Sequence, residues 1–261
     1  MRALPRKLRA AWRDERGFTL IELLIATLAG IIVATATSAI VVASVHFSSN
    51  LGNRVDANQE GRVAMEKITQ ALNSSCAATG VTPLVGAPAP TGMVGGAAGG
   101  SDANDAIFYS RLSDLATIEP NEVEVSLTGT APSQQLIMST YPNTTTAGSP
   151  PPWTFSTTPT NFVLLPRAAA ATIGGVAQPV FQYYAYSGSA ISTTAIPSSQ
   201  LPLSTAAAAT VAEVTISFES LPSNNGANVS APGAGADISD SVVFRLTPAS
   251  SAPNASNTPC T

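Results

Sequence analysis

The sequence predicts an α+β fold: a long amino-terminal helix, membrane-spanning in its first half, packs against a carboxy-terminal antiparallel β-sheet with long loops. Three observations predict it. Residues 18–45 form an apolar run whose single charged residue is Glu22. Residues 18–75 contain no proline, so nothing in that stretch interrupts a helix. After Cys76, short segments of alternating apolar and polar residues are separated by turn-rich stretches.

The composition limits the chemistry that the chain can perform. Of 261 residues, 44% are hydrophobic, 11% are charged and one is histidine. Globular domains usually carry about a quarter charged residues, so few side chains here are suited to acid–base work. We therefore expect a folded protein that is not an enzyme and binds no cofactor.

The first predicted element is a basic segment, residues 1–17, which we interpret as a cytoplasmic leader. It holds six of the twelve basic residues. The remaining chain, residues 18–261, keeps 6 basic and 14 acidic residues and a formal net charge of −8. Because nucleic-acid binding requires a basic surface, we predict no nucleic-acid partner for the main body.

The second element is the membrane-spanning half of the helix, residues 18–46. Its 28-residue apolar run would form a helix of about 42 Å, enough to cross a hydrocarbon core of about 30 Å. The basic residues before it predict a cytoplasmic amino terminus, with the rest of the chain outside. The chain is thus expected in the cytoplasmic membrane as a single-pass protein.

Two ordinary interpretations of this segment compete with a retained functional helix. It could be a secretory signal peptide, cleaved after a small-residue stretch such as residues 35–39, or a plain signal anchor. Glu22 weighs against both, because a carboxylate near the membrane costs about 2.5–3.5 kcal/mol and is usually retained for a function.

The third element is the amphipathic half of the helix, residues 47–76, which is expected to pack against the following domain. The face predicted to make this contact consists of Leu51, Val55, Ala64 or Met65, Ile68 and Leu72. Gly30, Gly52 and Gly61 are possible weak points of the helix.

Residues 77–261 are predicted to form a β-rich head outside the cytoplasm. The predicted strands are residues 106–112, 122–127, 135–141, 162–165, 180–186, 211–219 and 242–246, with a helical turn at 203–209. Long loops are expected at residues 86–104, 142–160 and 222–239. Within the second loop, Trp153 and Phe155 are interpreted as an anchor onto the sheet, with an exposed partner contact as the alternative.

Cys76 and Cys260 lie at opposite ends of the head. An even number of cysteines in an extracytoplasmic domain favours a disulfide, which would tie the carboxy terminus to the end of the helix. Two free, buried cysteines are the alternative.

The residues of the head do not predict a catalytic or metal site. One histidine cannot support a Ser-His arrangement in the head, and cysteine and histidine are too few for a zinc site. Calcium binding is an alternative for the acidic residues of 102–105 and 237–240, but ordinary acidic side chains in solvated loops explain these residues better. We therefore predict no metal.

The string Arg-Gly-Phe-Thr-Leu-Ile-Glu-Leu-Leu at residues 16–24 resembles the class III signal of type IV pilins and pseudopilins. The resemblance implies cleavage after Gly17 by a prepilin peptidase and methylation of the new amino terminus, Phe18. It also implies that Glu22 neutralises the terminal amine of a subunit during docking. The spacing of four residues also permits pairing of Glu22 with its own Phe18, and the sequence leaves both open.

A weaker resemblance concerns the later part of the chain. Residues 179–188, which are rich in tyrosine, precede the valine-rich residues 211–218, and this order resembles J-type pseudopilins and W-type minor pilins. We therefore expect a minor pilin that is assembled into, or primes, a type IV pilus-like filament at the cell surface. Its expected partners are the major pilin, other minor pilins and the inner-membrane assembly platform. The alternatives are a pseudopilin of a type II secretion system and a filament-tip adhesin.

Overall fold

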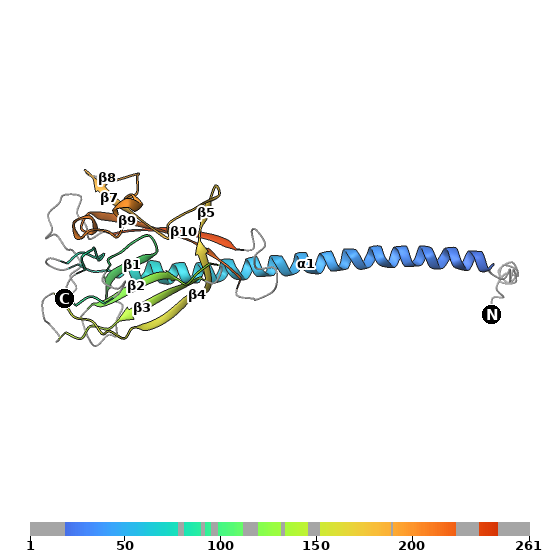
Figure 1. Ribbon diagram of the computed structural model, residues 1–261, viewed down its shortest axis with the longest axis horizontal. Coiled ribbons are helices and arrows are strands. Elements are labelled where there is room, and N and C mark those ends of the chain that lie inside the picture. The colour runs from blue at the N-terminus through green and yellow to red at the C-terminus, as the bar shows by residue number, and fades with distance from the viewer. Residues whose placement is uncertain are drawn as a thin grey trace, which may run out of the picture. The chain divides into compact units, whose positions relative to one another are not determined.

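The structure is a computed structural model that describes residues 19–77, 81–89, 92–94, 99–111, 120–131, 134–145, 152–188, 190–222 and 235–244. The chain divides into two compact units, Met1–Leu51 and Gly52–Thr261, and each is considered by itself. Figure 1 shows the long helix α1 and the strands of the head. The predicted α+β class is confirmed: a long apolar helix precedes an antiparallel sheet.

Helix α1 spans Leu20–Asn73. No proline interrupts it, and neither Gly30 nor Gly52 breaks it. At its carboxyl end the Ser74 hydroxyl donates to the carbonyl of Ala71 (2.6 Å), which satisfies one of the carbonyls that a helix end leaves without a partner. The helix therefore ends at Asn73, three residues before the end of the range 47–76 predicted for its amphipathic half.

The main sheet of the head is antiparallel throughout and has the order β1-β2-β3-β4-β9-β7-β8, with β10 paired to β9. Its strands are β1 Asp105–Ser110, β2 Asn121–Thr128, β3 Gln134–Tyr141, β4 Thr160–Ala170, β7 Phe181–Ser187, β8 Ala190–Ile191, β9 Val211–Ser220 and β10 Ala236–Val243. Strands β5 Thr172–Ile173 and β6 Val176–Ala177 form a separate hairpin. The short helices are η3 Ser198–Gln200 and α2 Thr205–Ala208.

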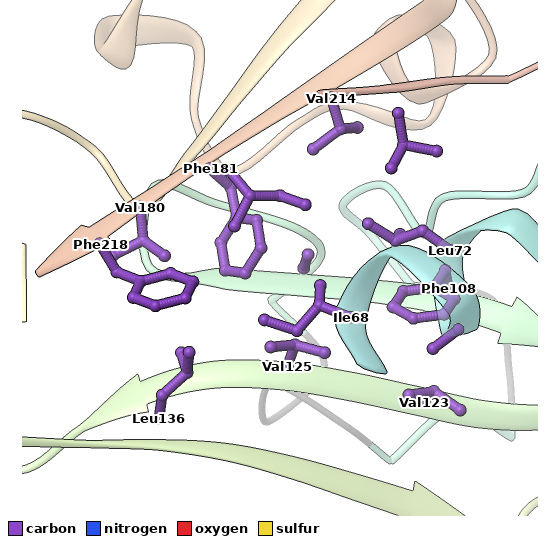
Figure 2. Packing of buried hydrophobic residues seen from close by; sticks show 14 of the residues in the cluster. Ile68, Leu72, Phe108, Val123, Val125, Leu136, Val180, Phe181, Val214 and Phe218 are labelled. Atoms are coloured by element: carbon purple, nitrogen blue, oxygen red, sulfur yellow. The ribbon is translucent and has the colours of Figure 1, made fainter. Parts of the chain in front are cut away.

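The sheet curves around the carboxy-terminal part of α1 and encloses the larger of two apolar clusters. In Figure 2, Ile68 of α1 lies between Phe181 on one side and Val125 on the other, and Leu72 lies one turn further along α1. All four side chains are fully buried. Residues of α1 and of strands from both ends of the sheet order belong to the same cluster, so the helix forms the centre of this core.

The helix face that packs against the sheet differs from the predicted one. Ile68, Leu72 and Met65 are buried as expected, but Leu51 and Val55 are 48% and 53% exposed. The buried positions begin instead with small residues, and the full set is Ala57, Gly61, Ala64, Met65, Ile68, Ala71 and Leu72. Small side chains let the helix approach the sheet closely. A prediction from hydropathy favours large apolar residues and so does not identify these positions.

Gly61 is a packing position rather than a weak point. A Cβ at Gly61 would lie 2.7 Å from Ile238 Cγ1 and 3.0 Å from Ser220 Cβ. Helix α1 therefore contacts the end of β9 and the start of β10 through the backbone of this residue.

Most predicted strands are confirmed, with differences at two places. Strand β4 has eleven residues where four were predicted. Strand β10 begins at Ala236, inside the loop predicted for residues 222–239, because it pairs with β9 along its whole length. The predicted helical turn at residues 203–209 is α2.

The two ends of the sheet order are also joined by a turn. The Tyr183 hydroxyl of β7 donates to the backbone carbonyls of Asp102 (2.8 Å) and Asp105 (3.1 Å), just before and at the start of β1. The Phe181 nitrogen donates to the Ala103 carbonyl (3.0 Å). The turn at residues 102–105 thus closes the sheet around α1.

Candidate functional site

The amino-terminal end of α1 is a reciprocal capping box. Thr19 precedes the first helical residue, Leu20, and its hydroxyl oxygen accepts from the Glu22 nitrogen (3.3 Å). In return, Glu22 Oε2 accepts from the Thr19 nitrogen (3.3 Å) and the Thr19 hydroxyl (3.2 Å). Each residue therefore satisfies a backbone donor that the helix would leave without a partner.

This arrangement fixes the Glu22 carboxylate in the first turn of α1. The Leu23 nitrogen donates to the Thr19 carbonyl (3.1 Å), so the helix begins directly after the cap. A carboxylate at a helix amino terminus also interacts favourably with the positive end of the helix dipole. At this site the Glu22 carboxylate holds a negative charge next to the backbone nitrogen of Thr19, the residue that follows Phe18.

The described part of the chain does not cover the apolar side chains that follow Glu22 along α1. Every residue of α1 up to Gly52 is exposed, including the large residues Leu24, Ile32 and Val41. In the part of the chain that the structure describes, α1 is the one helix that is long and apolar enough to cross a membrane. A core helix of a soluble protein would be mostly buried, whereas none of the most apolar window of α1 is buried by the described chain.

Three threonine hydroxyls in this apolar segment donate to backbone carbonyls of the helix itself. Thr27 donates to the Leu24 carbonyl (2.9 Å) and Thr35 donates to the Ile32 carbonyl (2.9 Å). Thr37 donates to the carbonyls one turn before it. Lipid supplies no hydrogen-bond partners, so these internal bonds make the segment compatible with a bilayer despite its threonines.

A family model of the prokaryotic N-terminal methylation motif matches residues 12–38. This range contains the capping box and the first part of the uncovered apolar helix. Together, the prepilin-type motif and the long apolar helix are features that type IV pilins and pseudopilins share. The motif supports processing of the chain by a prepilin peptidase, and the apolar helix supports anchoring by a single membrane span. No curated protein and no solved structure matches the chain.

Of the processing residues predicted for this prepilin, the structure describes Glu22. Gly17 and Phe18 lie outside the described residues, so cleavage after Gly17 and methylation of Phe18 stay predictions. Thr19 was missed as a partner of Glu22. Its signal was present in the sequence, because Thr-x-x-Glu before an apolar run is the spacing of a capping box.

The structure describes one of the two cysteines of the predicted disulfide, Cys76. Cys76 is fully buried, is not a free thiol, and its nitrogen donates to the Tyr109 carbonyl (3.1 Å). Cys260 lies outside the described residues, so the Cys76–Cys260 pairing stays a prediction.

The head contains no described cluster of three or more His, Cys, Asp or Glu residues that could hold a metal ion. Asp102 Oδ1 instead accepts from the backbone nitrogens of Asn104 (2.7 Å) and Asp105 (2.9 Å) and so shapes the turn. Asp237 and Asp240 lie in β10 rather than in a loop. Three residues apart in a strand, their side chains point to opposite faces, which removes the arrangement that calcium would need.

Asp105 is the carboxyl group that is most clearly perturbed by its surroundings. Burial, reinforced by the nearby charges of Asp102 and Glu124, raises its pKa from 3.8 to about 7. On the same face of the sheet, Glu124 Oε2 accepts from the Tyr141 hydroxyl (2.9 Å). This group of acids lies at the turn that closes the sheet.

The aromatic residues of the loop after β3 serve as the predicted anchor. Trp153 and Phe155 are 3% and 5% exposed. The ring centroid of Tyr109 lies 5.6 Å from that of Trp153 and 5.9 Å from that of Phe155. The exposed-contact interpretation of Trp153 is therefore wrong, because its indole belongs to a second apolar cluster of the head.

Proposed function

We propose that the chain is a minor pilin of a type IV pilus-like filament. The peptidase cleaves it after Gly17, the new amino terminus Phe18 is methylated, and the apolar half of α1 holds the subunit in the membrane. The amino terminus faces the cytoplasm and the head lies outside. The observation that carries the proposal is the methylation motif on a helix whose apolar side chains the described part of the chain does not cover.

Glu22 has a defined task in this account. It neutralises the Phe18 amine of a neighbouring subunit when apolar helices pack together, since burying one charge without the other is costly. The capping box supports this proposal, because it holds the carboxylate at the end of the helix, ready for an amine at this position. No covalent chemistry by the chain is involved, and the assembly platform does the work of extraction.

Site-specific capture of neighbours tests this function. Ala26→Cys places a thiol on the exposed apolar helix one turn after Glu22, and cross-linked partners are identified by mass spectrometry. Capture of a major pilin supports the minor pilin, and capture of secretion-system subunits identifies the alternative, a pseudopilin. Capture of no pilin-type subunit would contradict both.

A variant that cannot be processed is the matched control. Gly17→Arg should leave an uncut precursor, because the backbone must lie close to the peptidase at this residue. The cross-links from Ala26→Cys should then disappear from the filament fraction while the protein stays in the membrane.

A further inference from the structure

The turn at residues 101–105 accepts hydrogen bonds from several parts of the head. Its backbone carbonyls accept from the nitrogens of Leu127 of β2 (3.0 Å), Phe181 of β7 (3.0 Å) and Leu203 (2.8 Å). The Tyr183 hydroxyl of β7 donates to two more of them, at 2.8 Å and 3.1 Å. We call residues 101–105 the clasp, because these bonds tie β2 and β7 to the start of β1.

Three carboxylates gather at the clasp. Asp102 and Asp105 belong to it, and Glu124 lies on β2, two residues before Ser126, the cross-strand partner of Asp105. Asp102 Oδ1 accepts from backbone nitrogens of the turn, and Glu124 Oε2 accepts from the Tyr141 hydroxyl (2.9 Å). Among the described residues, no donor is bonded to the Asp105 carboxylate, so no such bond stabilises its charge.

The described charges that act on Asp105 are negative. Burial raises the pKa of Asp105 most, and the charges of Asp102 and Glu124 raise it further, to about 7 in place of 3.8. Like charges repel more strongly in a partly buried position than in water, because the protein screens them less. Ionised Asp105 therefore destabilises the same turn that its neutral form leaves undisturbed.

The other titratable groups at the clasp stay neutral around pH 7. Burial raises the pKa of Tyr183 above its ordinary value, so its hydroxyl remains a donor. Burial and the bond to the β2 carboxylate likewise raise the pKa of Tyr141 on β3. The two loops bonded to the clasp, residues 81–89 and 201–210, contain no charged residue. Asp105 is thus the group of the clasp whose charge changes near neutral pH.

Fully buried aromatic side chains adjoin the clasp. Phe108 lies three residues after Asp105 on β1, and the nitrogen of Phe181 on β7 is bonded to the turn. Both belong to the apolar cluster that includes Ile68 of α1, and in Figure 2 Ile68 lies next to Phe181. Opening of the clasp therefore weakens the contact of β1 and β7 with the carboxy-terminal part of α1.

We propose that the clasp is a pH-sensitive device, which holds β7 to the start of β1 while Asp105 is neutral and opens locally when Asp105 ionises beside Asp102 and Glu124. Opening hydrates the Asp105 carboxyl group, whose pKa then returns toward 3.8 from about 7. The open population therefore rises with pH between these two values and levels off above them. The opening breaks the bonds to the clasp and leaves the rest of the sheet paired. It takes place within one head, so it needs no assembly into a filament.

Site-resolved hydrogen exchange of the full-length chain in detergent tests the proposal. The Phe181 and Leu127 amides report on the clasp, because each donates to one of its carbonyls. Their protection factors, corrected for the pH dependence of chemical exchange, should fall about tenfold or more between pH 5 and pH 8. Protection should fall less in β3, none of whose described residues is bonded to the clasp. An equal fall in β3 would show global unfolding and overturn the proposal.

Asp105→Asn is the decisive variant, because asparagine keeps the size of the side chain but does not ionise. The protection of the Phe181 amide should then be the same at pH 5 and pH 8. Asp240→Asn, which removes an exposed acid on β10, is the matched control and should keep the native fall. A native fall in Asp105→Asn would contradict the role of Asp105 and overturn the proposal.

Glu124→Gln tests the gathered charges without a change in the turn itself. The glutamine oxygen still accepts from the Tyr141 hydroxyl, but the side chain has no charge. The pKa of Asp105 should then be lower, so the fall in protection should be smaller and should level off at a lower pH. An unchanged pH profile of the Phe181 amide would show that repulsion does not open the clasp, and would overturn the proposal.

Discussion

The Glu22 carboxylate accepts two hydrogen bonds from Thr19, so it is both a helix cap and a negative charge at the end of an apolar helix. These two roles predict different behaviour for different substitutions. Glutamine at this position still serves a capping box but has no charge. Valine at position 19 removes the cap at a cost of about 1 kcal/mol but leaves the charge.

We expect Glu22→Ala and Glu22→Gln to be processed normally and to be recovered poorly with sheared filaments, because both lack the counter-charge. Thr19→Val should keep most of its incorporation. The measurement is the fraction of the chain in the sheared filament fraction by immunoblot. Normal incorporation of Glu22→Gln would show that the cap, and not the charge, is what assembly requires.

Asp105 predicts a pH dependence of stability whose sign follows from its raised pKa. Well below pH 3.8 the group is protonated in the folded and the unfolded chain and has no effect. Between pH 3.8 and about 7 the unfolded chain ionises first, so the free energy of unfolding falls as pH rises. Above this range the destabilisation by Asp105 is fully present.

Asp105→Asn should therefore match the native chain in thermal stability near pH 4 and exceed it near pH 8. The measurement is the unfolding temperature of detergent-solubilised protein by circular dichroism at both values. Asp240→Asn is the control, because Asp240 is an exposed acid on β10. An equal gain at both pH values would contradict the assignment to ionisation of Asp105.

At the scale of elements, α1 packs on the sheet through small residues, and Gly61 is the closest approach. Gly61→Ala gains helix propensity, worth up to about 1 kcal/mol, but forces its Cβ against Ile238. Overpacking of this kind typically costs about 1–3 kcal/mol. Gly52→Ala makes the same propensity gain with no atom within 4 Å of the new Cβ.

We expect Gly61→Ala to lower the midpoint of chemical denaturation and Gly52→Ala to leave it unchanged or raise it. Both are measured on the purified chain with the same detergent and probe. Equal midpoints for the two variants would contradict the close packing of α1 against β9 and β10.

The predicted Cys76–Cys260 disulfide connects the end of α1 with the carboxy terminus. By the chain-entropy estimate such a long loop contributes at most about 5 kcal/mol. Mass analysis of the non-reduced, alkylated protein should show no modified thiol, and Cys260→Ser should unfold at lower denaturant. Alkylation of both cysteines in the native chain without reduction would rule the bond out.

At the scale of the whole molecule, the sequence predicts well whatever follows from periodicity along the chain. The uninterrupted apolar run predicts the helix, and alternating residues predict the strands around Val125 and Ile216. The structure contains all three elements. Contacts decided by distant residues were not predicted. Strand β10 exists because β9 pairs with it, and Leu51 and Val55 are exposed because the buried positions of α1 begin only at Ala57.

The candidate site shows the same division. The motif around Glu22 is local, so the order of residues in the chain is enough to identify it. The spacing of Thr19 from Glu22 is also enough to predict their pairing. The burial of Trp153 depends on Tyr109, forty-four residues earlier, and alternatives stayed open until the fold brought the two rings together.

The central claim is that residues 1–17 are removed and that the apolar helix of the mature chain starts at a modified Phe18. Amino-terminal sequencing and intact mass of the chain extracted from membranes test it most directly. We predict a mature chain that begins with N-methylated Phe18 and keeps the whole of α1. An amino terminus at Met1, or one within residues 35–39, would contradict the account.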